Sequence, residues 1–164
     1  MIDINDILST IEQVHTLNEN QTVYVGKPAI AFFKEYVLEH DNDFYEPLSG
    51  RIDVDAFVNK VHTLSTTFVL VQEGEVAGLI ASYFYDLPSE TGFITLTHTR
   101  QEFRGQHLSS ILLKAVQEYA RSINFKYIDL MVYKDNAPAF NLYLKHGFKV
   151  LTEDNGRCMM RWEG

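Results

Sequence analysis

The sequence has a single cysteine, Cys158, and no long run of apolar residues. One cysteine excludes an internal disulfide and a thiolate metal cage, and its place in an expected terminal strand predicts a buried structural thiol. Because a membrane-spanning helix needs about 18 or more consecutive apolar residues, we expect no membrane-spanning helix. The start of the chain lacks the basic and apolar pattern of a signal peptide, so we expect a cytoplasmic protein.

Basic residues are also scarce, since 14 Lys and Arg stand against 22 Asp and Glu, which gives a formal net charge of −8. A nucleic-acid partner is therefore not expected, because phosphate backbones are bound by basic surfaces. Cationic ligands such as amines would be mildly attracted. With 164 residues, of which 46% are hydrophobic, the chain suits one domain, 1–164, around its own core.

Helical patterns dominate the first 65 residues. Apolar residues at Ile4, Ile7, Leu8, Ile11 and Val14 have helical spacing after the possible caps Asp3 and Asn5. A short strand is expected at 22–25, before Gly26. A second helix is predicted from Pro28, in its first turn, to about His40, and a third from Val54 to about Leu64, capped by Asp53 or Asp55.

Strand patterns take over from Thr67. A hairpin joins 68–71 to 76–85, and a further strand covers 93–99. A helix follows to about Asn124, so the strand at 127–133 must run parallel to the strand at 93–99. A last helix begins at Asn136 and ends before Gly147, and Asn155-Gly156 favours a type I′ turn in a closing hairpin. These elements predict an α/β (α+β) fold with a mixed, mostly antiparallel sheet and helices on both faces.

The stretch Arg104-Gly105-Gln106-His107-Leu108-Ser109-Ser110 lies between a strand and an amphipathic helix. Such a turn presents unpaired N–H groups at the positive end of a helix dipole, which holds phosphate without a metal. Arg104 can add a charge-assisted contact, and the two serines can add hydroxyl donors. The stretch matches neither of the two nucleotide-loop fingerprints, and an ordinary structural turn is the alternative.

The later block of the chain carries the more specific pattern. Residues Asn136, Ala139, Leu142, Tyr143, Lys145, Gly147 and Phe148 fit N-x-x-A-x-x-L-Y-x-K-x-G-F. Over about residues 66–164 the chain thereby resembles the GCN5-related N-acetyltransferase (GNAT) superfamily. Its phosphate turn, R/Q-x-x-G-x-G/A, is matched at Arg104, whereas His107 and Ser109 stand where small residues are expected. We expect His107 to keep ordinary helical geometry, with its N–H available.

The resemblance implies acetyl-CoA as co-substrate, without a metal. In the family two parallel strands splay apart and the pantetheine arm pairs with a freed strand edge. Residues 66–164 would then form the acyl-CoA-binding and catalytic part, and 1–65 the acceptor-side helices. Asn136 caps a helix and is also a candidate for cofactor contact. The other expected cofactor-binding residues are Thr97, His98, Thr99, Arg104, Gly105, Gln106, His107, Leu108, Ser109, Ser110 and Tyr143.

The implied reaction is direct attack of a primary amine on the thioester in a ternary complex. Tyr143 matches the family's general acid, and a packed aromatic is the alternative reading. His98 is the candidate general base, with Glu102 or a relayed water as competitors. Along a regular strand His98 lies opposite Thr97 and Thr99, and either set could face the cleft.

The acceptor is a small molecule or a peptide amine, and its identity is left open. Candidate acceptor-pocket residues are Asp43, Tyr45, Tyr83 and Tyr85. The remaining histidines, His15, His40, His62 and His146, show no metal-ligand spacing, so we expect them on solvated faces or at helix caps. A homodimer is a family-level expectation. The alternative functions are a degenerate non-catalytic acyl-CoA-binding or sensing domain and an unrelated α/β interaction domain.

Overall fold

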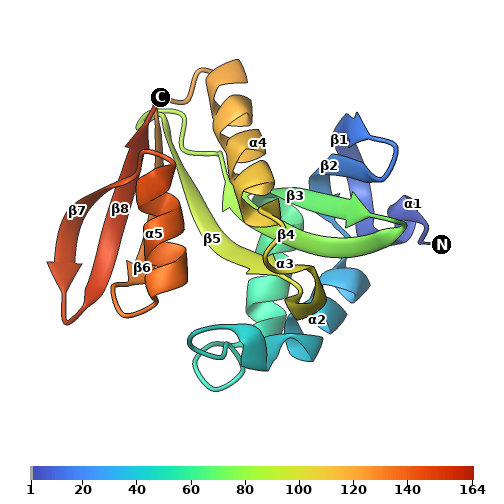
Figure 1. Cartoon of the computed structure of the whole chain (residues 1–164), viewed down its shortest axis with the longest axis horizontal. Coiled ribbons are helices and arrows are strands. Elements are labelled where there is room, and N and C mark those ends of the chain that lie inside the picture. Colours follow the sequence, from blue (N-terminus) through green and yellow to red (C-terminus); the bar gives the residue numbers. More distant parts are fainter. Residues whose placement is uncertain (1) are drawn as a thin grey trace.

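An eight-stranded sheet forms the centre of the protein, with helices on both of its faces (Figure 1). The computed structural model describes residues 2–164. The strand order across the sheet is β1-β2-β3-β4-β5-β6-β8-β7. In chain order the elements are α1 (Ile4–Ile7), β1 (Leu8–Asn18), β2 (Gln21–Pro28), α2 (Ile30–Glu39), the 3-10 turn η1 (Asp41–Asp43), α3 (Val54–Leu64), β3 (Ser65–Gln72), β4 (Glu75–Tyr83), β5 (Thr91–Thr99), the 3-10 turn η2 (Gln101–Phe103), α4 (Leu108–Ser122), β6 (Tyr127–Tyr133), α5 (Ala137–Lys145), β7 (Lys149–Asp154) and β8 (Arg157–Glu163).

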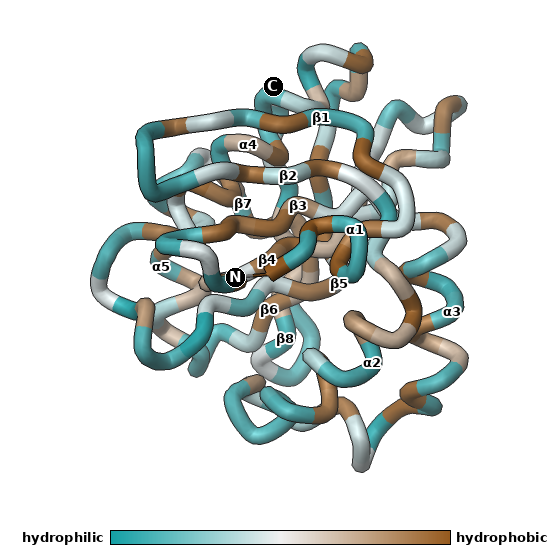
Figure 2. The backbone as a smooth tube through the Cα atoms, turned by 90° about the vertical axis from the view of Figure 1, so that its right-hand side faces the viewer, coloured by the Kyte–Doolittle hydropathy of each residue, from teal (hydrophilic) through white to brown (hydrophobic). Residues whose placement is uncertain are grey.

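Two hydrophobic cores lie on opposite faces of this sheet. The first packs α4 and α5 onto β2, β3, β4, β5, β6 and β8, and the second packs α1, α2 and α3 onto β3, β4 and β5. Strand β4 is buried along nearly its whole length because it contributes to both cores, and Figure 2 shows it brown over much of its path. Among residues 2–164, no helix has the length and apolar character that crossing a membrane requires.

The start of the chain departs from the prediction. Only Ile4–Ile7 is helical, and the rest of the expected helix is strand β1. Strand β1 pairs with β2 through three register irregularities. Ile11 and Val14, two of the helically spaced apolar residues, are exposed on this strand, so their spacing does not mark a buried helix face. The inter-strand hydrogen bonds with β2 therefore outweighed the periodicity. Pro28 likewise ends β2 instead of opening a helix, and Ala29 is the N-cap of α2.

The other main elements follow the prediction. The Asp53 carboxylate caps α3 by accepting a hydrogen bond from the Ala56 N–H at 3.1 Å. Strands β5 and β6 are parallel. Asn155 and Gly156, with φ of 51° and 78°, turn the closing hairpin in the left-handed region that a type I′ turn requires.

The parallel pair separates after a few residues. Strands β5 and β6 are paired only over Thr91–Ile94 and Tyr127–Leu130, although both continue beyond this segment. The backbone groups on the β6 side of β5 beyond Ile94 are therefore left without this strand partner. The splay expected from the resemblance is thus present.

A β-bulge at Thr95 marks the point of separation. On β4, Ala81 stands opposite Leu96 and Ser82 opposite Ile94, so Thr95 is the extra residue. Ile94 packs into the α4 core and Leu96 into the α2 core, although residues two apart on a regular strand share a face. The bulge therefore reverses the alternation and sends His98 toward α2.

Candidate active site in the strand splay

A cleft of about 1080 Å³ opens where β5 and β6 diverge. Its walls come from the last half of β5, the end of β6, the first turns of α4 and α5, and the loop after α2. Every predicted cofactor-binding residue except Gln106 lines this cleft. The splay thus brings together two segments, 97–110 and 136–143, that the sequence separates by a helix and a strand.

The turn before α4 has an unusual backbone. Gly105 and His107 both have positive φ, 84° and 61°, and His107 is the N-cap of α4. The expectation of ordinary helical geometry at His107 is therefore wrong. The chain passes from η2 to α4 within four residues, 104–107, and needs left-handed backbone twice to do so. A glycine is favoured at such a position because it has no Cβ.

Side chains fix this turn to β5. The Arg104 Nε–H donates to the Thr99 carbonyl at 3.2 Å, and the Thr99 and Ser109 hydroxyls are 2.7 Å apart. Since Nε is used, the terminal nitrogens of the Arg104 guanidinium are the ones available to a ligand. The first N–H groups of α4 belong to Leu108, Ser109 and Ser110, which line the cleft. Unpaired donors at a helix start suit an anion.

A glutamine chain that the sequence analysis missed anchors the turn to the sheet. The Gln106 side-chain oxygen accepts from the Gln72 amide at 2.8 Å, and Gln72 in turn accepts from Gln21 at 2.7 Å. The Gln106 side chain therefore points to the sheet. These partners lie on three separate elements, so no local pattern reveals them.

The first turn of α4 is also connected to the end of α5. His146, the C-cap of α5 as expected, has its Nε2 2.9 Å from the Ser110 hydroxyl oxygen. Its backbone carbonyl accepts from the Gln117 side chain at 2.8 Å. Burial lowers the pKa of His146, so the ring is neutral at pH 7. These bonds hold the two helices that carry the predicted cofactor residues in one arrangement.

Tyr143 projects from α5 to the splayed part of β5. Its hydroxyl is 3.3 Å from the Thr97 hydroxyl, and its side chain is buried. Burial raises the pKa of Tyr143, so the phenol stays protonated and can donate. At the other end of α5, Asn136 is the N-cap by position, but its side chain makes no capping hydrogen bond and lines the cleft.

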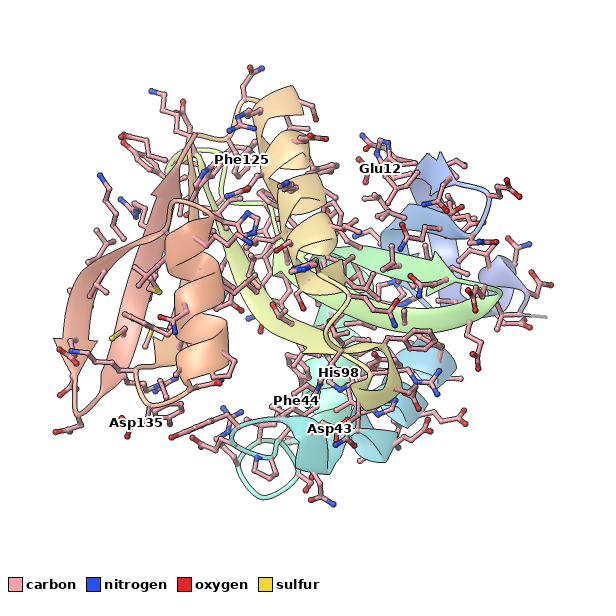
Figure 3. All side chains as sticks on the ribbon, viewed as in Figure 1. Glu12, Asp43, Phe44, His98, Phe125 and Asp135 are labelled. Atoms are coloured by element: carbon pink, nitrogen blue, oxygen red, sulfur yellow. The ribbon has the colours of Figure 1, made fainter. Side chains whose placement is uncertain are left out.

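His98 faces the opposite side of β5 and is nearly inaccessible. Its Nε2 is 3.0 Å from an Asp43 carboxylate oxygen, and its Nδ1 is 2.7 Å from the Tyr36 hydroxyl. The carboxylate can only accept, so Nε2 carries the proton and Nδ1 accepts from Tyr36. Figure 3 shows His98, Asp43 and Phe44 gathered between the end of β5 and the segment after α2.

The charges in this group follow from its burial. Burial lowers the pKa of His98, and the Asp43 carboxylate offsets only part of that effect. The hydrogen bond from His98 lowers the pKa of Asp43. Burial raises the pKa of Tyr36, which stays a phenol. At neutral pH the group therefore carries one negative charge, on Asp43, whose side chain is 26% exposed.

His40 completes this group, in addition to its expected place at a helix cap. It is the C-cap of α2, and its Nδ1 lies 3.3 Å from the Asp43 oxygen that His98 contacts. The His40 and His98 ring centroids are 4.7 Å apart, and the Phe44 ring packs against His98 with a centroid distance of 5.3 Å. Because His98 comes from a remote strand, the spacing of His40 and Asp43 alone does not reveal the cluster.

The predicted acceptor residues divide between two cavities. Asp43 and Tyr45 line the main cleft, where the Tyr45 ring stacks on the Tyr133 ring with their centroids 5.2 Å apart. Tyr83 and Tyr85 line a second cavity of about 480 Å³ instead. Glu102, the competing base, is ion-paired with Arg100 at 3.0 Å and does not line either cavity.

Four further cleft residues escaped the sequence analysis. The Tyr133 hydroxyl donates to the Glu46 carboxylate, which also pairs with Arg51 at 2.9 Å. The Arg157 guanidinium lies over the Tyr133 ring. These contacts join the loop after α2 to β6 and β8 within the lining of the cleft. The contacts of Tyr133 with Glu46 and Arg157 link segments distant in sequence, so no local motif predicts them.

A model described as the acetyltransferase (GNAT) family matches residues 30–148 of the chain. A comparison with curated proteins finds no match. The structure is similar to the ribosomal-protein-S18-alanine N-acetyltransferase from Escherichia coli, with 16% identity, TM-score 0.68 and coverage of 86% of this chain and 93% of that one.

Two similar structures hold the cofactor that the resemblance implies. The PaiA N-acetyltransferase from Thermoplasma acidophilum, in complex with coenzyme A, has TM-score 0.65 and 14% identity, and covers 87% of this chain and 99% of its own. A GNAT family acetyltransferase from Elizabethkingia anophelis with acetyl-CoA bound has TM-score 0.66 and 17% identity, and covers 90% of this chain and 100% of its own. At these identities the likeness shows the fold.

Proposed function

Because the match over residues 30–148 shows that the chain belongs to the GNAT acetyltransferase family, we propose that it transfers an acetyl group from acetyl-CoA to a primary amine. The observation that supports this most strongly is the splay of β5 from β6, with an anion-binding turn at one end and a buried phenol beside it. Acetyl-CoA and the acceptor amine would bind together in the cleft, as one ternary complex.

Acetyl-CoA binds, in this proposal, along the α4 and α5 side of β5. The pantetheine amides pair with the backbone of Thr97 to Thr99 that β6 leaves free. The pyrophosphate takes the N–H groups at the start of α4 and the terminal nitrogens of Arg104. Further polar groups line the same wall: the Ser109 and Ser110 hydroxyls, and the side-chain amide of Asn136, which makes no capping hydrogen bond.

The reaction is aminolysis of a thioester. The amine nitrogen forms a bond to the thioester carbon, the C–S bond of the tetrahedral intermediate breaks, and the sulfur leaves as a thiolate. Tyr143 donates its phenolic proton to that sulfur while a base removes the surplus proton of the amine. Tyr143 suits the role because it stays protonated in its buried position on the splayed strand.

The acceptor amine approaches from the α2 side of β5, where His98 is the candidate base. Both nitrogens of His98 are engaged, so it can act on an amine only through Asp43. The Asp43 carboxylate reaches the cleft and is negatively charged, which suits an ammonium or amine ligand. His98 then holds Asp43 in position and moderates its charge, while Tyr45 supplies an aromatic wall.

An acceptor screen tests the proposal. Purified protein is given acetyl-CoA and, separately, small amines, amino sugars, peptides with a free N-terminus and lysine peptides, and release of the coenzyme A thiol is followed. At least one class should raise thiol release well above hydrolysis, with a mass gain of one acetyl group on the acceptor. If acetyl-CoA binds but no class of amine accelerates thiol release, a non-catalytic acyl-CoA-binding domain is favoured. The observation that suggests this alternative is His107, a non-glycine residue in the phosphate turn.

A further inference from the structure

The His40, Asp43 and His98 side chains form a cluster with one imidazole more than the proposed transfer needs. One potential metal-ligand atom from each residue lies within 4.8 Å of the other two. A single hydrogen bond from His98 is enough to hold Asp43, yet a second imidazole is directed at the same oxygen. His40 Nδ1 is 3.3 Å from that oxygen, longer than the usual range of an N–H···O hydrogen bond.

The spacing of these atoms fits a small metal ion. In a tetrahedral site with metal–ligand bonds of about 2.0–2.2 Å, neighbouring ligand atoms are about 3.3 Å apart. The Asp43 oxygen lies 3.0 Å from His98 Nε2 and 3.3 Å from His40 Nδ1, which matches two edges of such a tetrahedron. Two imidazoles and one carboxylate form a donor set that suits zinc and its first-row neighbours, and not calcium or magnesium.

Both imidazoles also have a polar group behind them. The far nitrogen of His98 contacts the Tyr36 hydroxyl at 2.7 Å, which is a hydrogen bond, whereas the far nitrogen of His40 lies 3.9 Å from a Glu39 carboxylate oxygen, beyond hydrogen-bond distance. Metal-bound histidines nearly always have a hydrogen-bond partner on the far nitrogen, as His98 does, which fixes the ring and its tautomer. On metal binding the His98 proton moves from Nε2 to Nδ1, and the Tyr36 oxygen accepts it as a hydrogen bond.

We propose that His40, Asp43 and His98 form a binding site for one first-row divalent metal ion, of which zinc is the representative, at the acceptor end of the cleft. The protein supplies three ligands, and the fourth position opens to the cleft on the side of Asp43. The ion ties the end of α2 to β5 and takes the Asp43 oxygen that an amine would approach, so the metal-bound form and the form that receives the amine at Asp43 are alternative states of the same cluster. The site is argued from the cluster alone and does not depend on the acetyl transfer.

Metal titration tests this site without any activity assay. Chelator-treated protein is titrated calorimetrically with Zn²⁺, and with Co²⁺ while its visible absorption is recorded. One equivalent should bind with micromolar or tighter affinity, and bound Co²⁺ should show the stronger visible bands of a four-coordinate site. His40→Gln should weaken Zn²⁺ binding at least about tenfold, and Tyr36→Phe about 10–100-fold as the loss of an outer partner.

His15→Gln is the matched control, because His15 is an exposed histidine on β1. It should bind Zn²⁺ as the parent does, and circular dichroism should show all three variants folded. The proposal is overturned if the parent binds no Zn²⁺ below millimolar concentration. It is equally overturned if folded His40→Gln binds Zn²⁺ as tightly as His15→Gln, since the ion then sits elsewhere.

Discussion

The two sides of β5 are built in different ways. On the α4 and α5 side, the polar groups are backbone N–H groups at a helix start and hydroxyls from Thr97, Thr99 and Ser109, with the positively charged Arg104 beside them. On the α2 side the polar groups are side chains alone. The negatively charged Asp43 is held there by His98, which Tyr36 in turn hydrogen-bonds. The alternation of the strand puts consecutive residues on opposite sides, and the bulge at Thr95 decides that His98 lies on the α2 side and Thr97 on the other.

This difference indicates how each side tolerates change. Backbone donors persist when side chains are replaced, so the donor side can carry His107 where a glycine is favoured. A site made of buried side chains depends on each of them, because an unpaired buried polar group is costly. We therefore expect mutations on the donor side to act mainly through the few side chains that add chemistry, charge or strain.

The largest effect is expected at Tyr143, the one donor-side side chain with a chemical role. Tyr143→Phe keeps the ring and removes the hydroxyl, so acetyl-CoA affinity should stay within a few-fold. Loss of a general acid should lower kcat by about 10²–10⁴-fold, or roughly 3–5 kcal/mol of barrier. Steady-state rates with a responsive acceptor, together with calorimetric acetyl-CoA binding, measure both quantities.

The control is Tyr127→Phe, because Tyr127 lies at the start of β6, outside the residues that line the cleft. Its kcat should equal that of the parent. A kcat of Tyr143→Phe within threefold of the parent would remove Tyr143 from the mechanism and leave it as a core aromatic.

The next effect in size concerns Arg104, the charged side chain of the donor-side turn. Arg104→Ala should weaken coenzyme A by about 1.5–3 kcal/mol, the value of a charged hydrogen bond, and leave pantetheine without phosphate little affected. Arg104→Lys keeps the charge but cannot donate from Nε to Thr99, so its loss should be smaller. Calorimetry with both ligands decides the matter, and equal losses for the two would place Arg104 away from the phosphates.

A smaller effect is expected at His107, where a substitution should stabilise the protein instead of impairing it. A non-glycine residue in left-handed geometry costs about 1–2 kcal/mol, so His107→Gly should raise the free energy of unfolding by about 1 kcal/mol and keep coenzyme A binding. His107→Ala retains the Cβ and should stay near the parent. Urea unfolding and calorimetry test both. A large loss of affinity in folded His107→Gly would show that the imidazole itself contacts the ligand.

The smallest effect is a pH dependence on the acceptor side. Burial holds the pKa of His98 below its ordinary 6.5, so the unfolded chain binds this proton first on acidification. The stability contributed by neutral His98 is present above pH 6.5 and decreases as the pH falls toward the folded value. His146 has the same direction, so His98→Gln should reduce, without abolishing, the loss of stability between pH 7.5 and pH 5.

Urea unfolding at the two pH values, with chelator present, gives the required free energies. An unchanged pH dependence in His98→Gln would mean that His98 titrates normally. That result would contradict the enclosed arrangement of the acceptor side.

The donor side could be predicted from the sequence because it is local. The turn at 104–110, the strands on either side of α4 and the block from Asn136 to Phe148 each lie within a short stretch. Their patterns come from a helix start, a strand alternation and a cap, which depend on neighbouring residues. The positive φ of His107 was missed because few histidines adopt the left-handed backbone, although they do so more often than most residues.

The acceptor side could be predicted only in part. Asp43 and His98 were each identified, but their contact depends on the β-bulge at Thr95, and a threonine at that position does not predict a bulge. His40 was predicted only on a solvated face or at a helix cap, and Tyr36 was not singled out, because the contacts of both residues with His98 join segments remote in sequence. The strand at Leu8–Asn18 was missed for a similar reason, because its apolar residues have helical spacing while the pairing with β2 that fixes its conformation is a contact with another segment.

Amide hydrogen exchange with and without acetyl-CoA tests the central claim, that β5 separates a donor side from an acceptor side. Acetyl-CoA should slow exchange at residues 105–110 and at those amides of 97–99 that face away from β4. It should leave residues 36–45 unchanged. Slower exchange at 36–45 with none at 105–110 would contradict the account, because the cofactor would then occupy the side assigned to the amine.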